Sequence, residues 1–328
     1  MNLCSFTFQL EIHFMKNYVV GMIVLSVWFA PKTGNAQEEV TITQGNQTLA
    51  GTLVVPAGKG PFPVALLIAG SGPTDRNGNN PMMMNNALKI LADSLSKRGI
   101  ASLRYDKRGI GASRQVNQRE EDLDFSLGVQ DAEAWMKFLK KDTRLGKLTV
   151  IGHSEGALVG LLASGYANQY VSLNGPGFAA DELIRQQLTK QAPSLATLAE
   201  PILDSLKRGY SVTQVPPLLF SLFRPSVQPY MMSWFKHDPA RLISQLIIPG
   251  LVIQGSHDIQ VSTADADRLM QYNPTLQRVT VEGMNHILKL SPADRVQNVQ
   301  TYSNPNLPIP TTLILPLARF IQTGYWNR

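Results

Sequence analysis

The sequence has 328 residues, of which 44% are hydrophobic and 16% charged, so it can bury a large core. This composition excludes a disordered, collagen-like or disulfide-stapled chain. The net charge is +6, but the basic residues are scattered among acidic neighbours and form no basic run, which argues against a nucleic-acid-binding protein.

The first 36 residues have the pattern of a secretory signal peptide. Met15-Lys16-Asn17 begins a short basic region, residues 18–30 are apolar, and Gly34-Asn35-Ala36 supplies the small residues that a signal peptidase cleaves after. The apolar run is too short for a bilayer, which needs about 20 residues. We therefore predict cleavage before Gln37, a secreted or periplasmic protein, and no stable membrane anchor after cleavage. Met15 is an alternative start.

Cys4 is the only cysteine, and it lies in the segment predicted to be removed. The mature chain would then have no disulfide, no thiolate nucleophile and no cysteine-ligated zinc. The sequence also has no cluster of metal ligands at a typical spacing and no glycine-rich phosphate loop before a helix. We expect neither a metal nor a cofactor.

From Val40 onward, short β-branched runs alternate with longer amphipathic stretches, which indicates a mostly parallel sheet connected by helices. The predicted strands are residues 40–43, 49–55, 64–69, 101–105, 148–152, 170–173, 251–254 and 278–281. The predicted helices are residues 85–97, 126–140, 155–167 and 263–271. Gly45-Asn46 predicts that the first two strands form an antiparallel hairpin at the edge of the sheet.

The segment between the strands that end near Leu173 and begin near Leu251 contains no clear strand and has helical spacing. A structureless loop of this length is uncommon in a compact domain. We predict a helical insertion over residues 175–247, within one domain that spans residues 37–328. Pro216-Pro217, Pro225 and Pro229 should break the insertion into short helices.

The strongest local motif is Gly152-His153-Ser154-Glu155-Gly156, which joins a predicted strand to a predicted helix. A serine on such a tight turn is strained and projects its hydroxyl above the sheet, while the flanking glycines leave room for the turn. The N–H groups at the start of the helix can bind a developing negative charge. The motif therefore predicts that Ser154 is a nucleophile and not an ordinary helix-capping serine.

A serine hydroxyl needs a base, and four histidines follow the signal region. His286 lies in the loop after the predicted strand 278–281 and is the best candidate. His153 lies inside the turn and is expected to point away from the nucleophile. His237 is expected to be a helix-end or packing residue. His257 is expected to be held by its own loop or to line the site.

The histidine in turn needs a buried carboxylate that fixes its tautomer. Asp258 lies in the loop Gly255-Ser256-His257-Asp258 after the predicted strand 251–254, and it is favoured. Asp265 and Asp267 are the alternatives, although helical spacing would place both on a solvated face.

Two backbone N–H groups are expected to form an oxyanion hole. One belongs to Glu155, directly after the nucleophile. The other comes from the loop Gly70-Ser71-Gly72-Pro73, which follows the predicted strand 64–69. Ser71 is favoured and Gly72 is the alternative, while the glycines could also serve only to shape a turn.

With Ser154, Asp258 and His286 in this order, the sequence resembles the α/β-hydrolase superfamily, and more narrowly bacterial esterases with a GSGPxDRxGN loop. The matching segments are GSGPTDRNGN at 70–79, RYDKRGIGAS at 104–113, the turn around Ser154, QGSHD at 254–258 and MNH at 284–286. The first loop begins Ala69-Gly70 where many of these relatives have His-Gly.

The resemblance extends from residue 40 to the C-terminus. It implies an α/β-hydrolase fold, with a mostly parallel central sheet flanked by helices and a helical cap insertion. It also implies a cofactor-free serine carboxylesterase that acts on a small-molecule ester through an acyl-enzyme.

Several alternatives remain open at this stage. The same triad serves serine peptidases and thioesterases, and a protein of this fold could also bind a ligand without turnover. Asp75, Arg76 and Arg108 are expected either to brace the site or to contact substrate. The aromatic residues of the insertion could line a substrate pocket or pack in a core; they are Phe220, Phe223, Tyr230, Trp234 and Phe235. Nothing in the sequence indicates an oligomeric state.

Overall fold

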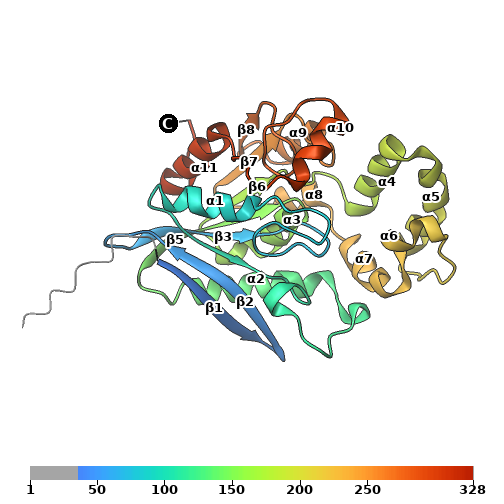
Figure 1. The fold of residues 1–328 in the computed structure, drawn as a ribbon, viewed down its shortest axis with the longest axis horizontal. Helices are drawn as coiled ribbons and strands as arrows, with labels where there is room; N and C mark the ends of the chain where they lie inside the picture. The colour runs from blue at the N-terminus through green and yellow to red at the C-terminus, as the bar shows by residue number, and fades with distance from the viewer. Residues whose placement is uncertain (1–35, 328) are drawn as a thin grey trace, which may run out of the picture. The chain divides into compact units, whose positions relative to one another are not determined.

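The computed structural model describes residues 36–327, and within them eight strands form one sheet (Figure 1). The order of the strands is β1-β2-β4-β3-β5-β6-β7-β8. The predicted signal peptide lies outside the described residues, apart from Ala36 at the start of β1. The described residues therefore include every residue of the predicted site.

All eight predicted strands are present, with ends that differ by a few residues. They are β1 (Ala36–Gln44), β2 (Gln47–Val55), β3 (Phe62–Ile68), β4 (Ala101–Tyr105), β5 (Leu145–His153), β6 (Gln169–Leu173), β7 (Gly250–Gly255) and β8 (Gln277–Val281). β1 and β2 form the predicted antiparallel hairpin at the sheet edge, and β2 runs antiparallel to β4. The other neighbours are parallel. The loops that follow the parallel strands therefore meet at one edge of the sheet.

Helices cover both faces of the sheet, because its central strands are apolar on both sides. On one face, Ala65 and Leu67 of β3 pack with α1 (Ala87–Ser96) and α11 (Thr311–Thr323). On the other face, Val64 and Leu66 pack in the cluster that includes α2 (Phe125–Leu139), α3 (Glu155–Leu162) and α9 (Thr263–Tyr272). Each fully buried aliphatic side chain contributes about 1.5–3 kcal/mol, so this double layer fixes the strand ends that carry the site.

Two helices near the C-terminus, α10 (Arg295–Gln300) and α11, were not predicted. Pro316 lies inside α11 and Pro310 directly precedes it, and proline ordinarily ends a helix. Leu313, Leu317 and Ile321 nevertheless lie on one face of α11 and are fully buried. Burial of this face against the sheet outweighs the local cost of the internal proline.

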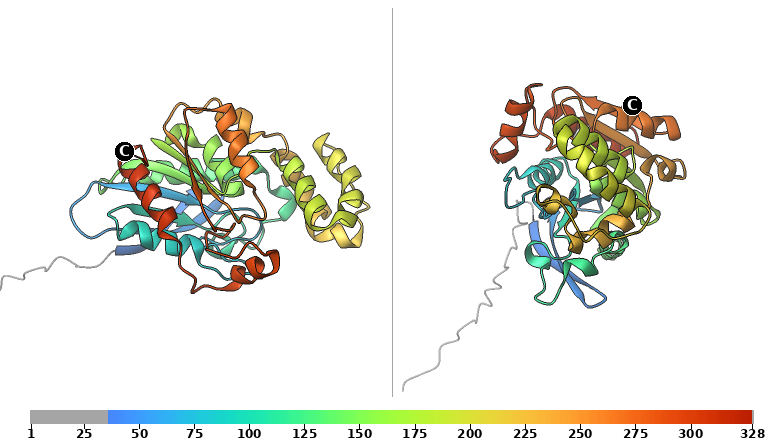
Figure 2. Two further views of the ribbon diagram at one scale, coloured as in Figure 1. Left: turned by 90° about the horizontal axis from the view of Figure 1, so that it is seen from above. Right: turned by 90° about the vertical axis from the view of Figure 1, so that its right-hand side faces the viewer.

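The helical insertion, residues 175–247, lies between β6 and β7. Its elements are α4 (Ala180–Gln191), α5 (Pro193–Lys207), η4 (Pro217–Leu219), α6 (Phe220–Phe223), η5 (Pro225–Val227), α7 (Gln228–Trp234) and α8 (Pro239–Ile243). Helices α4 to α7 gather at one end of the sheet (Figures 1 and 2). Pro217 and Pro225 begin short helices as predicted, whereas Pro229 lies within the first turn of α7.

The insertion has a hydrophobic cluster of its own, which includes Leu203, Phe223 and Phe235. Helix α8 differs, because its Ile243 belongs to the cluster of the main sheet. The last helix of the predicted insertion is therefore packed as part of the core. Among residues 36–327, no helix has the length and apolar character needed to cross a membrane.

Candidate active site

Ser154 lies on the sharp turn between β5 and α3, with φ 54° and ψ −126°. Residues other than glycine rarely adopt such a conformation, and it persists only where the surroundings impose it. Here a Cβ on Gly152 would lie 2.0 Å from the carbonyl oxygen of Gly156, and one on Gly156 would lie 2.5 Å from that of Ile68. Glycine is required at both positions, and this close packing holds the strained serine at the end of β5.

His286 and Asp258 form a buried pair in the loops after β8 and β7. Nδ1 of His286 lies 2.7 Å from Oδ2 of Asp258, and the two side chains are 6% and 0% exposed. The other carboxylate oxygen of Asp258 accepts hydrogen bonds from the backbone N–H groups of Gln260 and Val261. The loop thus fixes the carboxylate, which orients the ring and leaves Nε2 as the nitrogen available to exchange a proton.

Ser154 and His286 line one pocket, of about 140 Å³, which we call the nucleophile pocket. Gly70 and Ser71 line it as well. A Cβ on Gly70 would lie 3.0 Å from Cβ of Ser154, so the loop after β3 passes directly over the serine. The structure therefore brings Ser154, His286 and Ser71 together, with Glu155 next to the serine at the start of α3 and Asp258 behind the histidine.

Lys107 holds the loop over the nucleophile, a role that the sequence analysis did not assign. Its Nζ donates to the carbonyl oxygens of Gly70 and Gly72, the latter at 2.9 Å. Burial lowers the pKa of this lysine, while the nearby Glu155 carboxylate opposes the shift. With both carbonyls bound, the loop is held in place over the serine.

The carboxyl group of Glu155 is buried away from solvent, and burial raises its pKa although Lys107 and Tyr230 act in the opposite direction. The Tyr230 hydroxyl, on α7 of the insertion, donates to its Oε1 at 2.9 Å. The side chain of Glu155 thus links the start of α3 to the insertion. Its backbone N–H is a separate group, which lies beside the serine.

Asn174, directly after β6, is a second positioning residue that the sequence analysis missed. It has a φ of 48°, and its Oδ1 accepts from the N–H of Gly255 at 2.9 Å. Its Nδ2 donates to the carbonyl oxygens of Asn285 and His286 at 2.9 and 3.2 Å. One buried amide therefore joins the loop of the histidine to the strand that leads to Asp258. No local motif marks it, because its partners are more than eighty residues away.

Known proteins match this architecture. Residues 85–242 match the family described as serine aminopeptidase, S33. Esterase EstD of Thermotoga maritima is 30% identical over 260 residues, which are 76% of this chain and 60% of that protein. This chain therefore spans only 60% of the length of that curated relative.

Solved structures share the fold at low identity. The Pyrococcus furiosus esterase Pf2001 has a TM-score of 0.55 and 17% identity, over 89% of this chain and 94% of that one. Proline iminopeptidase of Mycobacterium smegmatis has a TM-score of 0.56 and 14% identity, over 87% and 98%. This chain has the α/β-hydrolase fold.

The remaining histidines of the described residues have other surroundings. The ring of His153 was expected to point away from the serine, but it lines the nucleophile pocket, 4.9 Å from the ring of His286. Burial lowers its pKa to about 4, and its Nε2 lies 2.7 Å from the carbonyl oxygen of His286. His257 is held by the segment after β8 and not by its own loop, with Nδ1 2.7 Å from the Ser291 carbonyl oxygen. His237 packs against Phe125, as predicted.

The two alternative acids lie elsewhere, and one expectation about them was wrong. Asp267 is exposed and pairs with Arg278, as helical spacing predicted. Asp265 is fully buried, because it caps α9 by accepting from the N–H of Ser262 and also accepts from the N–H of Gly177. Helical periodicity missed this role, since a capping carboxylate turns back toward the backbone of the first turn.

The charged loop residues brace the site. The guanidinium of Arg108 donates twice to the buried Asp131, at 2.7 and 2.6 Å. Arg76 donates to Asp106 through its backbone N–H and through Nε, at 2.8 and 3.0 Å. Asp75 accepts from N–H groups within its own loop. These bonds correspond to bracing, which is one of the two roles expected for these residues.

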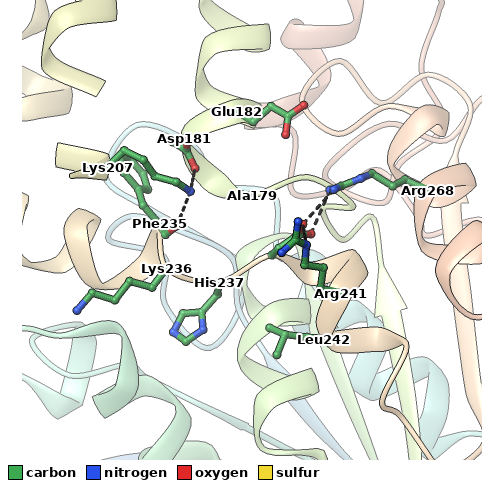
Figure 3. Close-up of a pocket in the computed structure, with 11 residues that line it drawn as sticks. Ala179, Asp181, Glu182, Lys207, Phe235, Lys236, His237, Arg241, Leu242 and Arg268 are labelled. Carbon is green, nitrogen blue, oxygen red and sulfur yellow. Dashed lines mark hydrogen bonds and ion pairs between the residues drawn. The ribbon is translucent and has the colours of Figure 1, made fainter. Parts of the chain in front are cut away.

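A larger cavity, of about 550 Å³, lies where the insertion leaves and rejoins the core (Figure 3). Arg268 of α9 lines it and binds both Asp238 and the carbonyl oxygen of Gly177, so it ties the two connecting segments together. None of the residues that line this cavity is Ser154, Asp258 or His286. Among residues 36–327, no group of three or more His, Cys, Asp or Glu side chains could hold a metal ion.

Proposed function

We propose that this α/β-hydrolase cleaves carboxylic esters of small molecules through an acyl-enzyme. The observation that carries the proposal is that the strained Ser154 shares a pocket with His286, whose Nδ1 is bound to the buried Asp258. A serine, a histidine and a fixed carboxylate in this relation are the components of nucleophilic catalysis by serine.

In the proposed mechanism, Oγ of Ser154 attacks the ester carbonyl carbon while Nε2 of His286 takes the hydroxyl proton. The carbonyl oxygen becomes an oxyanion, which accepts hydrogen bonds from the N–H groups of Glu155 and Ser71. The carbon–oxygen bond to the alcohol breaks, and His286 returns the proton to the leaving oxygen. Water then attacks the acyl-serine in the same way and releases the acid.

Two independent comparisons support ester substrates. EstD, the curated relative at 30% identity, is an esterase, and so is the structural neighbour from Pyrococcus furiosus. The location of the chain is also part of the proposal: the N-terminal pattern favours export to the periplasm or the medium after cleavage before Gln37.

A second candidate is an aminopeptidase, because the matched family is described as serine aminopeptidase, S33. Such an enzyme must bind the substrate's ammonium group, which calls for an unpaired carboxylate in the site. Among the described residues that line the nucleophile pocket there is no Asp or Glu. Next to it, Asp131 is paired with Arg108 and Glu155 accepts from Tyr230. Because these carboxylates already have partners, this arrangement favours a neutral ester over a substrate with an ammonium group.

Hydrolysis of 4-nitrophenyl acetate and of alanine 4-nitroanilide by residues 37–328 tests both candidates, with Ser154→Ala as the matched variant. We expect turnover of the ester, lowered by roughly 10⁴-fold or more in Ser154→Ala because the nucleophile is lost. Equal ester hydrolysis by the folded variant would refute the mechanism. Turnover of the anilide alone would assign the chain as an aminopeptidase.

A further inference from the structure

A second pocket, of about 270 Å³, adjoins the nucleophile pocket, and we call it the apolar pocket. One loop lines both. The apolar pocket is lined by Ala69, Gly72 and Pro73, and the nucleophile pocket by Gly70, Ser71 and Thr74. The nucleophilic turn is divided in the same way, with Ser154 in one pocket and Glu155 in the other. The two pockets thus meet at the groups proposed to hold the oxyanion.

The apolar pocket presents hydrocarbon to an occupant. Its lining from the core and the insertion includes Ile68, Ile110, Leu123, Leu127, Val159 and Val227. The charged groups in its wall already have partners. Arg108 pairs with Asp131 and Glu120 with Arg224. Lys107 donates to two backbone carbonyls, Glu155 accepts from Tyr230, and Asp124 accepts from the N–H of Ser126. A charged or strongly polar ligand would find no free partner among them, whereas an alkyl chain gains about 0.8 kcal/mol for each CH₂ group buried.

The histidine decides which part of the substrate enters each pocket. His286 must reach the leaving oxygen to protonate it, so the alcohol lies on the side of His286. That side is the nucleophile pocket, where Asn80, Asn85 and Gln260 supply polar groups. The acyl group extends from the opposite side of the carbonyl carbon, toward the pocket that Glu155 and Pro73 line.

We propose that the apolar pocket binds the acyl group of the ester, and that Leu127 and Gly128 on α2 set the acyl length it accepts. This inference rests on the ester hydrolysis proposed above. Small-molecule pockets commonly have volumes of about 300–1,000 Å³. The apolar pocket, at about 270 Å³, lies just below that range and matches a short or medium acyl chain. The nucleophile pocket, at about 140 Å³, matches a small alcohol.

Gly128 offers a direct way to fill the apolar pocket. It lines the pocket from near the start of α2, and the nearest atom to a Cβ placed on it is Cγ2 of Val159, at 3.9 Å, an ordinary contact. Leucine also favours a helix more than glycine does. Gly128→Leu therefore shortens the pocket with little strain, while Leu127→Ala lengthens it. Gly165→Leu is the matched control, because Gly165 is exposed and a Cβ there meets no atom within 4 Å.

The test compares two ester series on the wild type and these variants, with near-ultraviolet circular dichroism to verify folding. One series contains 4-nitrophenyl esters from acetyl to dodecanoyl, and the other contains acetates of alcohols from methanol to octanol, followed by acid release. We expect Gly128→Leu to lower the ratio of kcat/KM for octanoyl to that for acetyl by about tenfold or more. We expect Leu127→Ala to move the optimum to longer acyl chains, and Gly165→Leu to follow the wild type.

The proposal is overturned if the folded variants keep the acyl profile of the wild type, or if they change the order of the acetates instead. If Gly128→Leu does not fold, the direction of the shift in Leu127→Ala decides. If the wild type hydrolyses esters through Ser154 but the variants keep its acyl profile, the acyl pocket alone is refuted and the proposed function stands. Absence of turnover on every ester would refute the proposed function and this inference together.

Discussion

The loops at the strand ends and the helical insertion are held in different ways. The loops are fixed by buried bonds from several directions: Asn174 joins the loops of the histidine and the acid, and Lys107 holds the loop over the serine. The insertion has its own small hydrophobic cluster. Side chains such as Tyr230 and Arg224 connect it to the core.

This difference corresponds to two functions, catalysis and the selection of the substrate. Catalytic atoms must hold their positions closely, so they belong on a rigid and densely bonded frame. Substrate selection tolerates variation, and the insertion contributes Val227 and Tyr230 to the apolar pocket. The arrangement predicts large effects on turnover from changes in the strand-end loops, and small effects on stability from changes at the contacts of the insertion.

After Ser154→Ala, the largest effect is expected from Asp258→Asn, which should lower kcat by roughly 10³–10⁴-fold at neutral pH. The asparagine Oδ1 can still accept from Gln260 and Val261, so the loop should keep its form. Its NH₂ group would face Nδ1 of His286 and favour the tautomer with the proton on Nε2, which cannot accept the proton of Ser154. Steady-state kinetics at pH 7 measure the loss.

Asp267→Asn is the matched control, because this carboxylate is exposed on α9 and pairs only at the surface with Arg278. Its kcat should stay within about twofold of the wild type, since exposed pairs contribute little. Comparable activity in the two variants would contradict the assignment of Asp258.

The next largest effect expected is on the free energy of unfolding, whose pH dependence His153 contributes to. Burial lowers the pKa of His153 to about 4, from an ordinary value of 6.5. Between these values the folded protein binds fewer protons than the unfolded chain, so stability rises with pH across this window. The contribution is at most about 3 kcal/mol, present in full above pH 6.5 and lost as the pH falls toward 4.

Replacing His153 with Gln removes this titration, so urea unfolding of the variant should depend less on pH between 4 and 6.5 than that of the wild type. His237→Gln is the comparison from the insertion. Burial also lowers the pKa of His237, but its side chain is only partly buried, and the change of slope should be smaller. If the free energy of unfolding depended equally on pH in His153→Gln and in the wild type, His153 would not be shielded from solvent in the folded state.

A moderate effect is expected from Lys107→Met, which removes the bonds to the carbonyl oxygens of Gly70 and Gly72. Loss of one direct oxyanion donor costs about 10²–10³-fold in kcat, and loss of the group that positions the donor should cost less, about 10- to 100-fold. The loss should appear in kcat with little change in KM, because the bound substrate carries no oxyanion and the charge develops only as the serine attacks.

Lys107→Arg should recover part of the rate, since a guanidinium can donate to both carbonyls. Lys89→Met is the control on an exposed lysine that pairs with Asp93. A rise in KM at constant kcat in Lys107→Met would contradict a role in positioning the oxyanion donors.

The scaffold could be predicted from the sequence because its signals are local. Buried strands such as β3 are short apolar runs, and Gly152 and Gly156 mark the turn of Ser154 within five residues. Helix α11 escaped prediction because Pro316 contradicts a helix locally, and only tertiary burial of Leu317 and its neighbours resolves the conflict.

The residues that complete the site could not be predicted from periodicity, because their partners are distant in sequence. Asn174 binds groups 81 to 112 positions away, and Lys107 binds carbonyls 37 and 35 positions away. Asp265 shows the opposite error, since periodicity placed it in solvent while a capping bond buried it. Contacts that depend on how loops meet at the sheet edge become visible only in three dimensions.

The smallest effect is expected at the contact between the insertion and the core. Nε of Arg224 donates to Glu120 at 2.8 Å, and both side chains are about one third exposed. Exposed ion pairs contribute about 0–1 kcal/mol, so Glu120→Gln should lower the free energy of unfolding by less than about 1 kcal/mol. Arg224 lowers the pKa of Glu120 below its usual 4.5, so this contribution is present above that pH and is lost as the pH falls through the lowered pKa.

Urea unfolding at pH 7 and at pH 3 measures this contribution, with Glu121→Gln as the control on the exposed neighbouring carboxylate. Limited proteolysis adds a local measurement, since a loosened contact should increase cleavage within residues 175–247 before cleavage in the core. A loss of several kcal/mol in Glu120→Gln would mean that this contact stabilises the whole fold. The insertion would then be as firmly fixed as the strand-end loops, and the two regions would not differ in the way that their bonds indicate.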